Sequence, residues 1–387
     1  MEKKQIVFVE PKPTVIIYRI ARTLKLTGKY EVILVTFSKI DKQFYSSAYD
    51  KILVLELSHK MDRNFLHTIK DFFNKISSKD GRKFFTDIKK MKPYLFHVTG
   101  PDAFSLMTML FMGNSKKIYY ANDIWGMDKR NFFFTKEFWI KGEIQKFSEK
   151  VCMRDVDGVI NKMSPKEFEL LSYKVNAPKM YISPSLLDEW TFAPKKKNGK
   201  DIHIVFGGSP HSIWPGKNRY IDAMRVITSQ KIHFHTYGEC LDKKDGEFFA
   251  NEAKKNKYYS YHKGIKPNEL NREMSQYHYG IFPPFEDMDE NSLNEQKILL
   301  GAKMLNYLEA GLPIIIDKEC EYMRAIIEKY EIGFGVDLND LKNLRKILEK
   351  KDYAQLQRNV KKFQEEFRLN KKIKEMEAFY EKITKSE

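Results

Sequence analysis

The sequence predicts an α/β protein with two doubly wound domains, each built on a parallel β-sheet, that face each other across a central cleft. Short runs of β-branched and aromatic residues alternate with longer amphipathic segments, as in repeated βαβ units. This alternation stops in a polar, lysine-rich stretch near residue 200 and then restarts, which indicates an interdomain linker. The length of 387 residues also favours two domains.

In the first half, the pattern predicts seven strands separated by helices, and we place the first domain at residues 1–190. The clearest helices are Thr14–Leu26 and Lys136–Arg154. The expected strands are Gln5–Glu10, Glu31–Phe37, Lys51–Leu55, Tyr94–Val98, Lys117–Ala121, Gly158–Asn161 and Lys179–Ser183.

In the second half, strand and helix patterns alternate again, and we place the second domain at residues 200–365. The expected strands are Ile202–Gly207, Lys231–Tyr237, Tyr258–His262, Tyr279–Pro283, Pro313–Asp317 and Gly333–Val336. From Asp337 onward only helices are expected. The last segment, 366–387, is expected to form a helix that packs back toward the first domain.

The composition narrows the class of partner. The net charge of +16 favours an anionic partner: nucleic acid, an anionic membrane surface or a phosphorylated ligand. The charge is spread along the chain and no nucleic-acid recognition module is present, so nucleic acid is not expected. A lysine-rich surface that only interacts with water is the alternative. The three cysteines lie far apart in sequence and suggest neither a disulfide framework nor a zinc site.

The sequence favours a cytoplasmic protein that is at most peripheral on the inner face of the membrane. The first residues lead into a strand-like run without the apolar region of a signal peptide. The longest apolar stretch, 103–112, is too short to span a bilayer.

Three segments at predicted strand ends of the second half could contact a ligand. Gly207 and Gly208 end the first strand, and Lys217 follows them. Glycines let a ligand approach the backbone, and the next helix offers free N–H groups to phosphate. The second segment is the turn at Gly264, and the third is Lys303–Asp317. Taken alone, each of the first two also fits an ordinary turn.

In this order, these segments resemble the C-terminal domain of GT-B glycosyltransferases, particularly those of family 4 and their relatives. The matching segments are Gly207-Gly208 with Lys217-Asn218, Gly264–Leu270, Tyr277–Pro284 and Lys303–Pro313. Upstream, 147–164 and 181–188 also match. The resemblance implies a GT-B fold and transfer of a sugar from a nucleotide-sugar donor, with UDP-sugar favoured. The implied acceptor is a glycan or a lipid-linked molecule, and neither a metal nor another cofactor is implied.

The resemblance also implies donor-binding residues. The diphosphate is expected on the amides of Gly207 and Gly208 and at the N-terminus of a helix over Lys297–Ala310, near Lys217 and Lys303. The base is expected near Gly264 and Ile265. Asn306, Tyr307 and Glu309 of the same helix complete the expected binding set.

The chain departs from the family pattern at several of these positions. Asn306 stands where relatives have the carboxylate that binds the donor ribose, and Glu309, one turn further on, is a substitute candidate. The earlier glutamate of the family falls on Ile298. These departures favour one alternative, a GT-B-like nucleotide-binding protein with degenerate or lost catalysis. A sugar epimerase shares the fold, but we could not place the carboxylates that it needs.

Catalytic groups are expected from the first domain. The candidates are His97, Asp102 and Asp123, each at or after a predicted strand end. An inverting enzyme needs one of them as the general base that deprotonates the acceptor hydroxyl group. Asp123 is favoured because it matches an aspartate of the relatives at this strand end. A capping or turn role is the alternative for each.

Residues 128–150 interleave aromatic and basic side chains. This composition suits the headgroup region of a membrane and suggests docking to an anionic membrane surface. The alternative is that the aromatic residues pack the helix onto its own sheet.

Overall fold

The computed structural model describes most of the chain. The described residues are 3–56, 74–100, 109, 112–121, 136–162, 164–169, 171, 173–182, 184–193, 201–210, 217–240, 242–285 and 296–385. Within them, the side chains of 136–142, 144, 167, 217 and 218 are not described.

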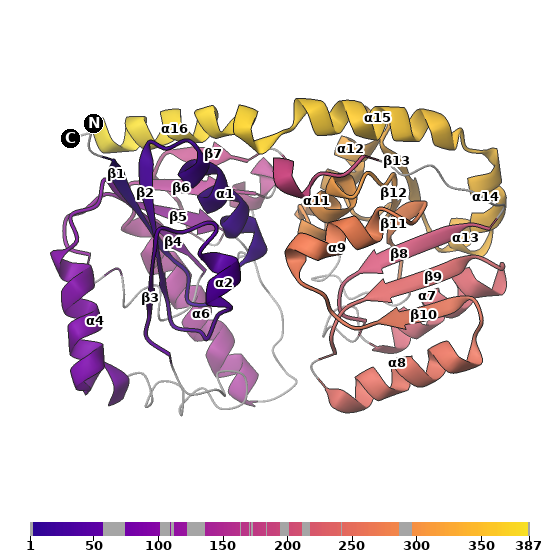
Figure 1. The fold of residues 1–387 in the computed structure, drawn as a ribbon, viewed down its shortest axis with the longest axis horizontal. Helices are drawn as coiled ribbons and strands as arrows, with labels where there is room; N and C mark the ends of the chain where they lie inside the picture. Colours follow the sequence, from indigo (N-terminus) through magenta and orange to yellow (C-terminus); the bar gives the residue numbers. More distant parts are fainter. Residues whose placement is uncertain are drawn as a thin grey trace. The chain divides into compact units, whose positions relative to one another are not determined.

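The chain divides into two compact units (Figure 1). Unit 1 comprises Met1–Ser183 together with Leu369–Glu387, and unit 2 comprises Pro184–Arg368. Unit 2 is therefore one continuous segment, whereas unit 1 is made of two segments. Each unit is an α/β domain with one parallel sheet, so the predicted fold class is confirmed.

Unit 1 alternates strands and helices along the sequence. Its strands are β1 (Lys4–Val9), β2 (Tyr30–Thr36), β3 (Lys51–Val54), β4 (Leu95–Thr99), β5 (Lys117–Ala121), β6 (Gly158–Asn161) and β7 (Lys179–Tyr181). Its helices are α1 (Val15–Leu26), α2 (Lys42–Tyr45), α4 (Lys79–Lys90), α6 (Lys136–Arg154) and α16 (Leu369–Lys385), with a 3-10 turn at Pro165–Glu169. All seven predicted strands are confirmed to within two residues at each end.

The unit 1 sheet has the strand order β3-β2-β1-β4-β5-β6-β7, and all pairs are parallel. One face forms a core with α4 and α6, through residues such as Val7, Phe96 and Phe84. On the other face α16 packs against α1 and covers the middle of the sheet. A Cβ on Gly158 of β6 would touch Phe379 and Ile383 of α16, so the last helix lies directly on this sheet.

Unit 2 repeats the same alternation. Its strands are β8 (His203–Gly207), β9 (His233–Tyr237), β10 (Tyr259–His262), β11 (Tyr279–Phe282), β12 (Ile314–Asp317) and β13 (Gly333–Val336). Its helices are α7 (Lys217–Ser229), α8 (Lys243–Lys255), α9 (Pro267–Met274), α11 (Ala302–Glu309), α12 (Glu321–Lys329), α13 (Leu338–Lys342), α14 (Leu344–Lys350) and α15 (Tyr353–Glu366), with a 3-10 turn at Asp188–Trp190. All six predicted strands are confirmed, again to within two residues.

The unit 2 sheet has the strand order β10-β9-β8-β11-β12-β13 and is also parallel. Two separate apolar cores cover its faces. One contains Val205, Met304 and Phe363, and the other contains Phe206, Phe234 and Ile281. Because side chains alternate along a strand, adjacent residues such as Val205 and Phe206 belong to opposite cores.

One predicted helix begins later than expected. The sequence pattern predicted a helix over 297–310, but α11 begins at Ala302, after an extended Gly301 that provides no side-chain cap. Residues 296–298 form a separate helical turn. Glycine in a helix interior is unfavourable by roughly 1 kcal/mol relative to alanine, which explains the break at this position.

Candidate functional site

The carboxyl ends of β8 and β11 mark the switch point of the unit 2 sheet. From β8 the chain adds β9 and β10 on one side, and it then returns to place β11 on the other side of β8. The two crossovers leave in opposite directions, and ligands of doubly wound domains bind at such a switch point. Gly207 and Gly208 lie at this position.

The amides of these two glycines are already engaged within the protein. The Gly207 N–H donates to the Tyr307 hydroxyl oxygen at 3.0 Å, and the Gly208 N–H donates to the Tyr237 carbonyl oxygen at 2.7 Å. The expectation that these amides hold a diphosphate is therefore corrected. Their engagement arises from tertiary neighbours, which a sequence pattern does not reveal.

Gly208 instead makes room for Lys303. A Cβ at Gly208 would overlap the Lys303 Cε atom. The Lys303 Nζ atom lies 5.0 Å from the centroid of the Phe206 ring, within the range of a cation–π contact. Lys303 is the second residue of α11, so the first turn of this helix and the lysine ammonium lie at the same edge of the sheet. The structure thus brings two of the predicted residues, Gly208 and Lys303, into contact.

The Lys303 ammonium group lacks an anionic partner among the described residues. In the described part of the chain, no hydrogen bond or ion pair joins its ammonium group to another residue. Burial lowers the pKa of Lys303 below its usual value, and Cys320 nearby partly offsets this shift. A buried ammonium without a counter-charge gains most from an anionic ligand, because the ligand restores the interaction lost with water.

The Tyr307 hydroxyl group joins two strands of the unit 2 sheet at its carboxyl edge. Its side chain is fully buried, and its hydroxyl group accepts from Gly207 and donates to the Ile281 carbonyl oxygen at 3.0 Å. A Cβ on Gly280 would overlap its ring. Tyr307 therefore links the ends of β8 and β11 and sets their spacing. This assignment replaces the expected contact with a ligand.

Glu309 is also committed within the protein. Its side chain is fully buried, and its Oε1 atom accepts from the Leu187 N–H at 2.8 Å. Its Oε2 atom accepts from the Asn271 side-chain amide at 2.7 Å. Since both carboxylate oxygens are used, the suggestion that Glu309 binds the donor ribose is corrected. Asn306 lies one turn earlier on α11 and is partly buried.

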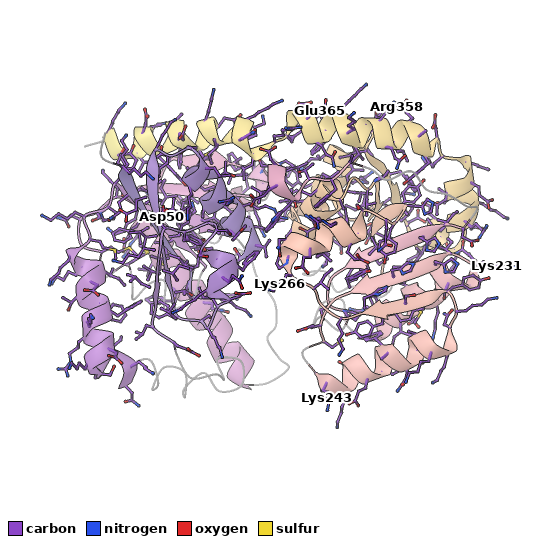
Figure 2. The ribbon with its side chains drawn as sticks, viewed as in Figure 1. Asp50, Lys231, Lys243, Lys266, Arg358 and Glu365 are labelled. Atoms are coloured by element: carbon purple, nitrogen blue, oxygen red, sulfur yellow. The ribbon has the colours of Figure 1, made fainter. Side chains whose placement is uncertain are left out.

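The turn after β10 lies at the same carboxyl edge of the sheet. Ile265 is exposed, and a Cβ on Gly264 would come within 2.8 Å of the Glu239 Cγ atom in the loop after β9. Lys266, labelled in Figure 2, is exposed and directly precedes α9. Gly264 and Ile265 therefore lie on a rim formed by the loops after β9 and β10. Lys217 begins α7, but its side chain is outside the described atoms.

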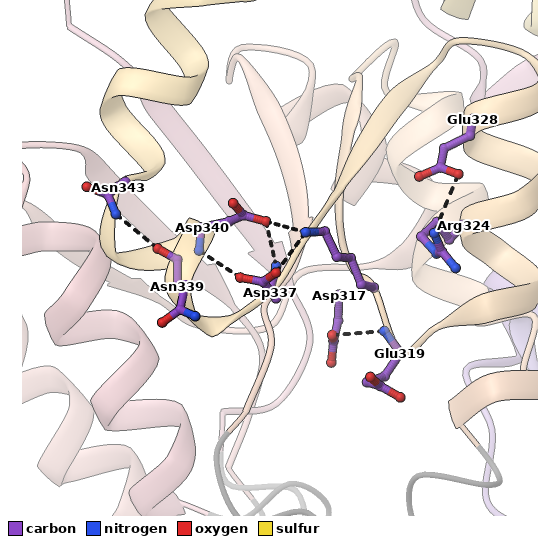
Figure 3. A network of polar contacts seen from close by, with 9 residues as sticks. Asp317, Glu319, Arg324, Glu328, Asp337, Asn339, Asp340 and Asn343 are labelled. Carbon is purple, nitrogen blue, oxygen red and sulfur yellow. Dashed lines mark hydrogen bonds and ion pairs between the residues drawn. The ribbon is translucent and has the colours of Figure 1, made fainter.

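A buried carboxyl group that was not predicted as a site residue lies at the end of β12. Asp317 is almost fully buried, and burial raises its pKa. Its Oδ2 atom accepts from the Gln296 side-chain amide at 2.7 Å, and its Oδ1 atom accepts from the Glu319 N–H at 3.1 Å. The ammonium group of the next residue, Lys318, contacts Asp337 and Asp340, each at 2.7 Å. Figure 3 shows Asp317, Asp337 and Asp340 at this end of the sheet. Its place at the end of a predicted strand was the available signal for Asp317.

In unit 1, His97 is not placed as a general base. It lies within β4, is fully buried, and its ring packs against Phe8 and Tyr380. Neither ring nitrogen has a hydrogen-bond partner among the described residues. Burial lowers the pKa of His97 to about 3, which makes it a weak base. The other two candidates, Asp102 and Asp123, lie outside the described residues.

Glu10 is a second buried carboxyl group that was not predicted as a site residue. It follows β1, next to β4, at the switch point of the unit 1 sheet. The carboxyl group is fully buried and accepts from the Thr14 N–H at 2.9 Å and from the Tyr49 hydroxyl group at 2.8 Å. Burial raises the pKa of Glu10 to about 7, against the lowering effect of these hydrogen bonds. Its place at the end of the predicted strand Gln5–Glu10 was the available signal.

Two α/β domains with one parallel sheet each are the architecture of the GT-B fold. Residues 215–377 match the family model described as "Glucosyltransferase 3-like, C-terminal domain". The resemblance to GT-B glycosyltransferases is thereby confirmed for the fold and for this part of the chain. No sequence among curated proteins matches.

Solved structures with this fold align over nearly the whole chain. Alr3699/HepE of Anabaena, solved in complex with UDP and glucose, is 12% identical, with 97% of this chain and 99% of that chain covered and a TM-score of 0.62. A glycosyltransferase from Rickettsia africae is 13% identical, with 100% of both chains covered and a TM-score of 0.63. TcCGT1, solved in complex with UDP, is 12% identical, with 99% and 100% covered and a TM-score of 0.59. At these identities the likeness shows the fold.

Proposed function

We propose that this chain is a glycosyltransferase that moves a sugar from a UDP-sugar donor to a glycan or lipid-linked acceptor without a metal ion. The observation that carries the proposal is the Lys303 ammonium group, which has no hydrogen-bond or ion-pair partner among the described residues and which Gly208 admits to the switch point of unit 2. The glucosyltransferase family model over residues 215–377 and the UDP complexes of structural relatives support the choice of donor. Glucose is the first sugar to test.

The donor diphosphate would lie against Lys303 and the first turn of α11. The N–H groups of a first helical turn have no partner within the helix, so they and the ammonium group present fixed positive charge to the leaving nucleoside diphosphate. Such preorganised charge stabilises the transition state as a metal ion otherwise would. Lys217 would add a second cation. The base would stack at Gly264 and Ile265, and Asn306 would bind a ribose hydroxyl group.

The acceptor would be activated from unit 1. Because His97 is buried and weakly basic, Asp123 and Asp102 remain the proposed bases for an inverting reaction. We further propose a cytoplasmic location with docking to an anionic membrane surface through residues 128–150. The exposed ring of Phe147, on α6, supports this surface. Among the described residues, no helix is both long enough and apolar enough to cross a membrane.

The test is a single substitution of the cation. Lys303→Met keeps the length and apolar part of the side chain but removes the ammonium group. We expect UDP affinity, measured by isothermal titration calorimetry, to fall about ten- to a hundredfold, the value of one charge-assisted hydrogen bond. Lys318→Met is the matched control, because its ammonium group already pairs with Asp337 and Asp340. Equal UDP affinity of wild type and Lys303→Met would refute this site.

A nucleotide-binding protein that has lost catalysis is the second candidate. Asn306 in place of a carboxylate and the buried His97 favour it. The two candidates differ in turnover. A glycosyltransferase hydrolyses or transfers the sugar of at least one donor in a panel of nucleotide sugars. A protein that only binds nucleotide is stabilised against thermal unfolding by UDP but leaves every donor intact.

A further inference from the structure

Five of the nine histidines of the chain gather on one face of the unit 2 sheet. The parallel register pairs His203 with His233, while Val205 pairs with His235 and His262 with Tyr237. Residues two apart on a strand share a face of the sheet, and so do register partners on neighbouring strands. The side chains of His203, His233, His235 and His262 therefore point to the same face. The fifth histidine, His278, precedes β11 and joins the group through the His203 backbone N–H, which donates to its Nδ1 atom at 3.1 Å. All five rings are partly exposed.

Three of these rings form a continuous hydrogen-bonded chain, here called the imidazole ladder. The His203 Nδ1 atom lies 3.0 Å from the His235 Nε2 atom, and the His235 Nδ1 atom lies 3.3 Å from the His262 Nε2 atom. Each neutral imidazole has one donor and one acceptor nitrogen, so the two bonds must run in the same direction along the ladder. His235, at the centre, uses both of its ring nitrogens.

The ring nitrogens of the ladder point at one another in pairs at hydrogen-bond distance. In the described part of the chain, no group of three or more histidine, cysteine or acidic side chains is placed to hold a metal. A proton added to one end can move along the ladder, because each ring passes on the bond from its neighbour. The three rings are therefore one coupled group. Burial and the charges of the neighbouring histidines lower the pKa of His235 to about 3, so the first proton goes to the outer rings of the ladder.

Several titratable and charged groups face the ladder. Glu273 of α9 lies near His262 and accepts a hydrogen bond from the Tyr237 hydroxyl group. The ring of Tyr237 stacks on the ring of His262. Three more tyrosines face the five rings: Tyr277 packs on His235, Tyr258 packs on His233, and Tyr353 of α15 packs on His278. The Lys257 ammonium group lies over the Tyr258 ring. Burial lowers the pKa of His262, and Glu273, the only carboxylate that the described contacts place at the ladder, partly offsets this shift.

The His262 end of the ladder is separated from the proposed nucleotide site by one layer of loops. The Gly238 N–H donates to the His262 carbonyl oxygen at 3.3 Å, and a Cβ on Gly238 would overlap the Gly208 carbonyl oxygen. Glu239 in turn packs on Gly264. The loops after β9 and β10 thus lie between the ladder and the glycine that admits Lys303.

We propose that the imidazole ladder is a proton-binding site linked to nucleotide binding, so that proton uptake on His203, His235 and His262 strengthens binding of the anionic donor. This inference rests on the proposed function, because it concerns the same nucleotide site. The ladder's positive charge attracts the diphosphate through one layer of loops. At physiological salt, such a charge contributes about threefold in affinity.

The test compares the pH dependence of donor binding in two matched variants. His235→Phe keeps a ring in the sheet face but breaks both hydrogen bonds of the ladder. His97→Phe removes a buried imidazole from unit 1 and is the control. The probe is UDP-glucose, whose diphosphate keeps its charge across this pH range, and circular dichroism confirms that every protein is folded. Affinity is measured by calorimetry between pH 8 and pH 5.5.

We expect wild type and His97→Phe to gain about threefold more affinity on acidification than His235→Phe. The comparison removes any contribution from Lys303, which is unchanged in all three proteins. In parallel, NMR titration of histidine ring protons should show that His235→Phe shifts the titration of His203 and His262. Binding with the same pH profile in all three proteins overturns the linkage and leaves the proposed function intact. No UDP-glucose binding at any pH overturns both, and independent titration of the rings overturns the ladder itself.

Discussion

The buried carboxyl group of Glu10 gives the sharpest test of the structure. The substitution is Glu10→Gln, which removes the titratable proton and keeps the shape of the side chain. The glutamine carbonyl oxygen can still accept from the Thr14 N–H, and its amide can donate to the Tyr49 hydroxyl oxygen. The change therefore isolates the free-energy cost of ionising the Glu10 carboxyl group in the folded protein.

The expected magnitude follows from the shift in pKa. Burial raises the pKa of Glu10 from 4.5 to about 7, so the folded state binds its proton more tightly than the unfolded state. The stability from this proton is full below pH 4.5 and is lost as the pH rises through 7. Between pH 5 and pH 8, linkage predicts a loss of about 2.5 kcal/mol of unfolding free energy in the wild type. Glu10→Gln lacks this loss.

The assay is urea unfolding of the full chain at several pH values between 5 and 8. The Glu10→Gln protein should gain about 2.5 kcal/mol over the wild type as the pH rises across this range. Glu375→Gln, on the exposed side of α16, is the control and should change stability by less than about 0.5 kcal/mol at every pH. Parallel pH profiles for wild type and Glu10→Gln would show that this carboxyl group is not buried as described.

Two further substitutions test the supports of the unit 2 site. Tyr307→Phe removes the hydroxyl group that joins the ends of β8 and β11, and we expect urea unfolding to show a loss of about 1–3 kcal/mol together with weaker UDP binding. An unchanged UDP affinity would mean that the strand spacing does not matter to the ligand. Glu309→Ala leaves the Leu187 N–H and the Asn271 amide without their acceptor, with an expected loss of about 2–4 kcal/mol. A loss below about 1 kcal/mol would contradict this bracing role.

The positions of the strands along the chain could be predicted from local pattern, because each strand is a short run rich in β-branched or aromatic residues. The edge of the unit 2 sheet could be located for the same reason. The contacts made by the residues at this edge could not be predicted. The amides of Gly207 and Gly208 are occupied by Tyr307 and Tyr237, which come from distant parts of the sequence.

His97 shows the same limit in unit 1. A histidine in a strand can face a ligand or a core, and the sequence near β4 does not distinguish the two. The deciding partner is Tyr380 on α16, which lies far away in sequence and packs its ring against His97. Its burial depends on a helix whose placement the local pattern around β4 does not encode.

The division of unit 1 into two segments has a consequence for synthesis on the ribosome. Translation runs from the N-terminus, so the strands of unit 1 emerge first, but α16, which covers one face of their sheet, emerges only after all of unit 2. Unit 2 is continuous and can complete its own core earlier. The first unit to be translated is therefore the last to be completed, and a nascent chain that stops before Leu369 leaves the apolar face of the unit 1 sheet open to chaperones or aggregation.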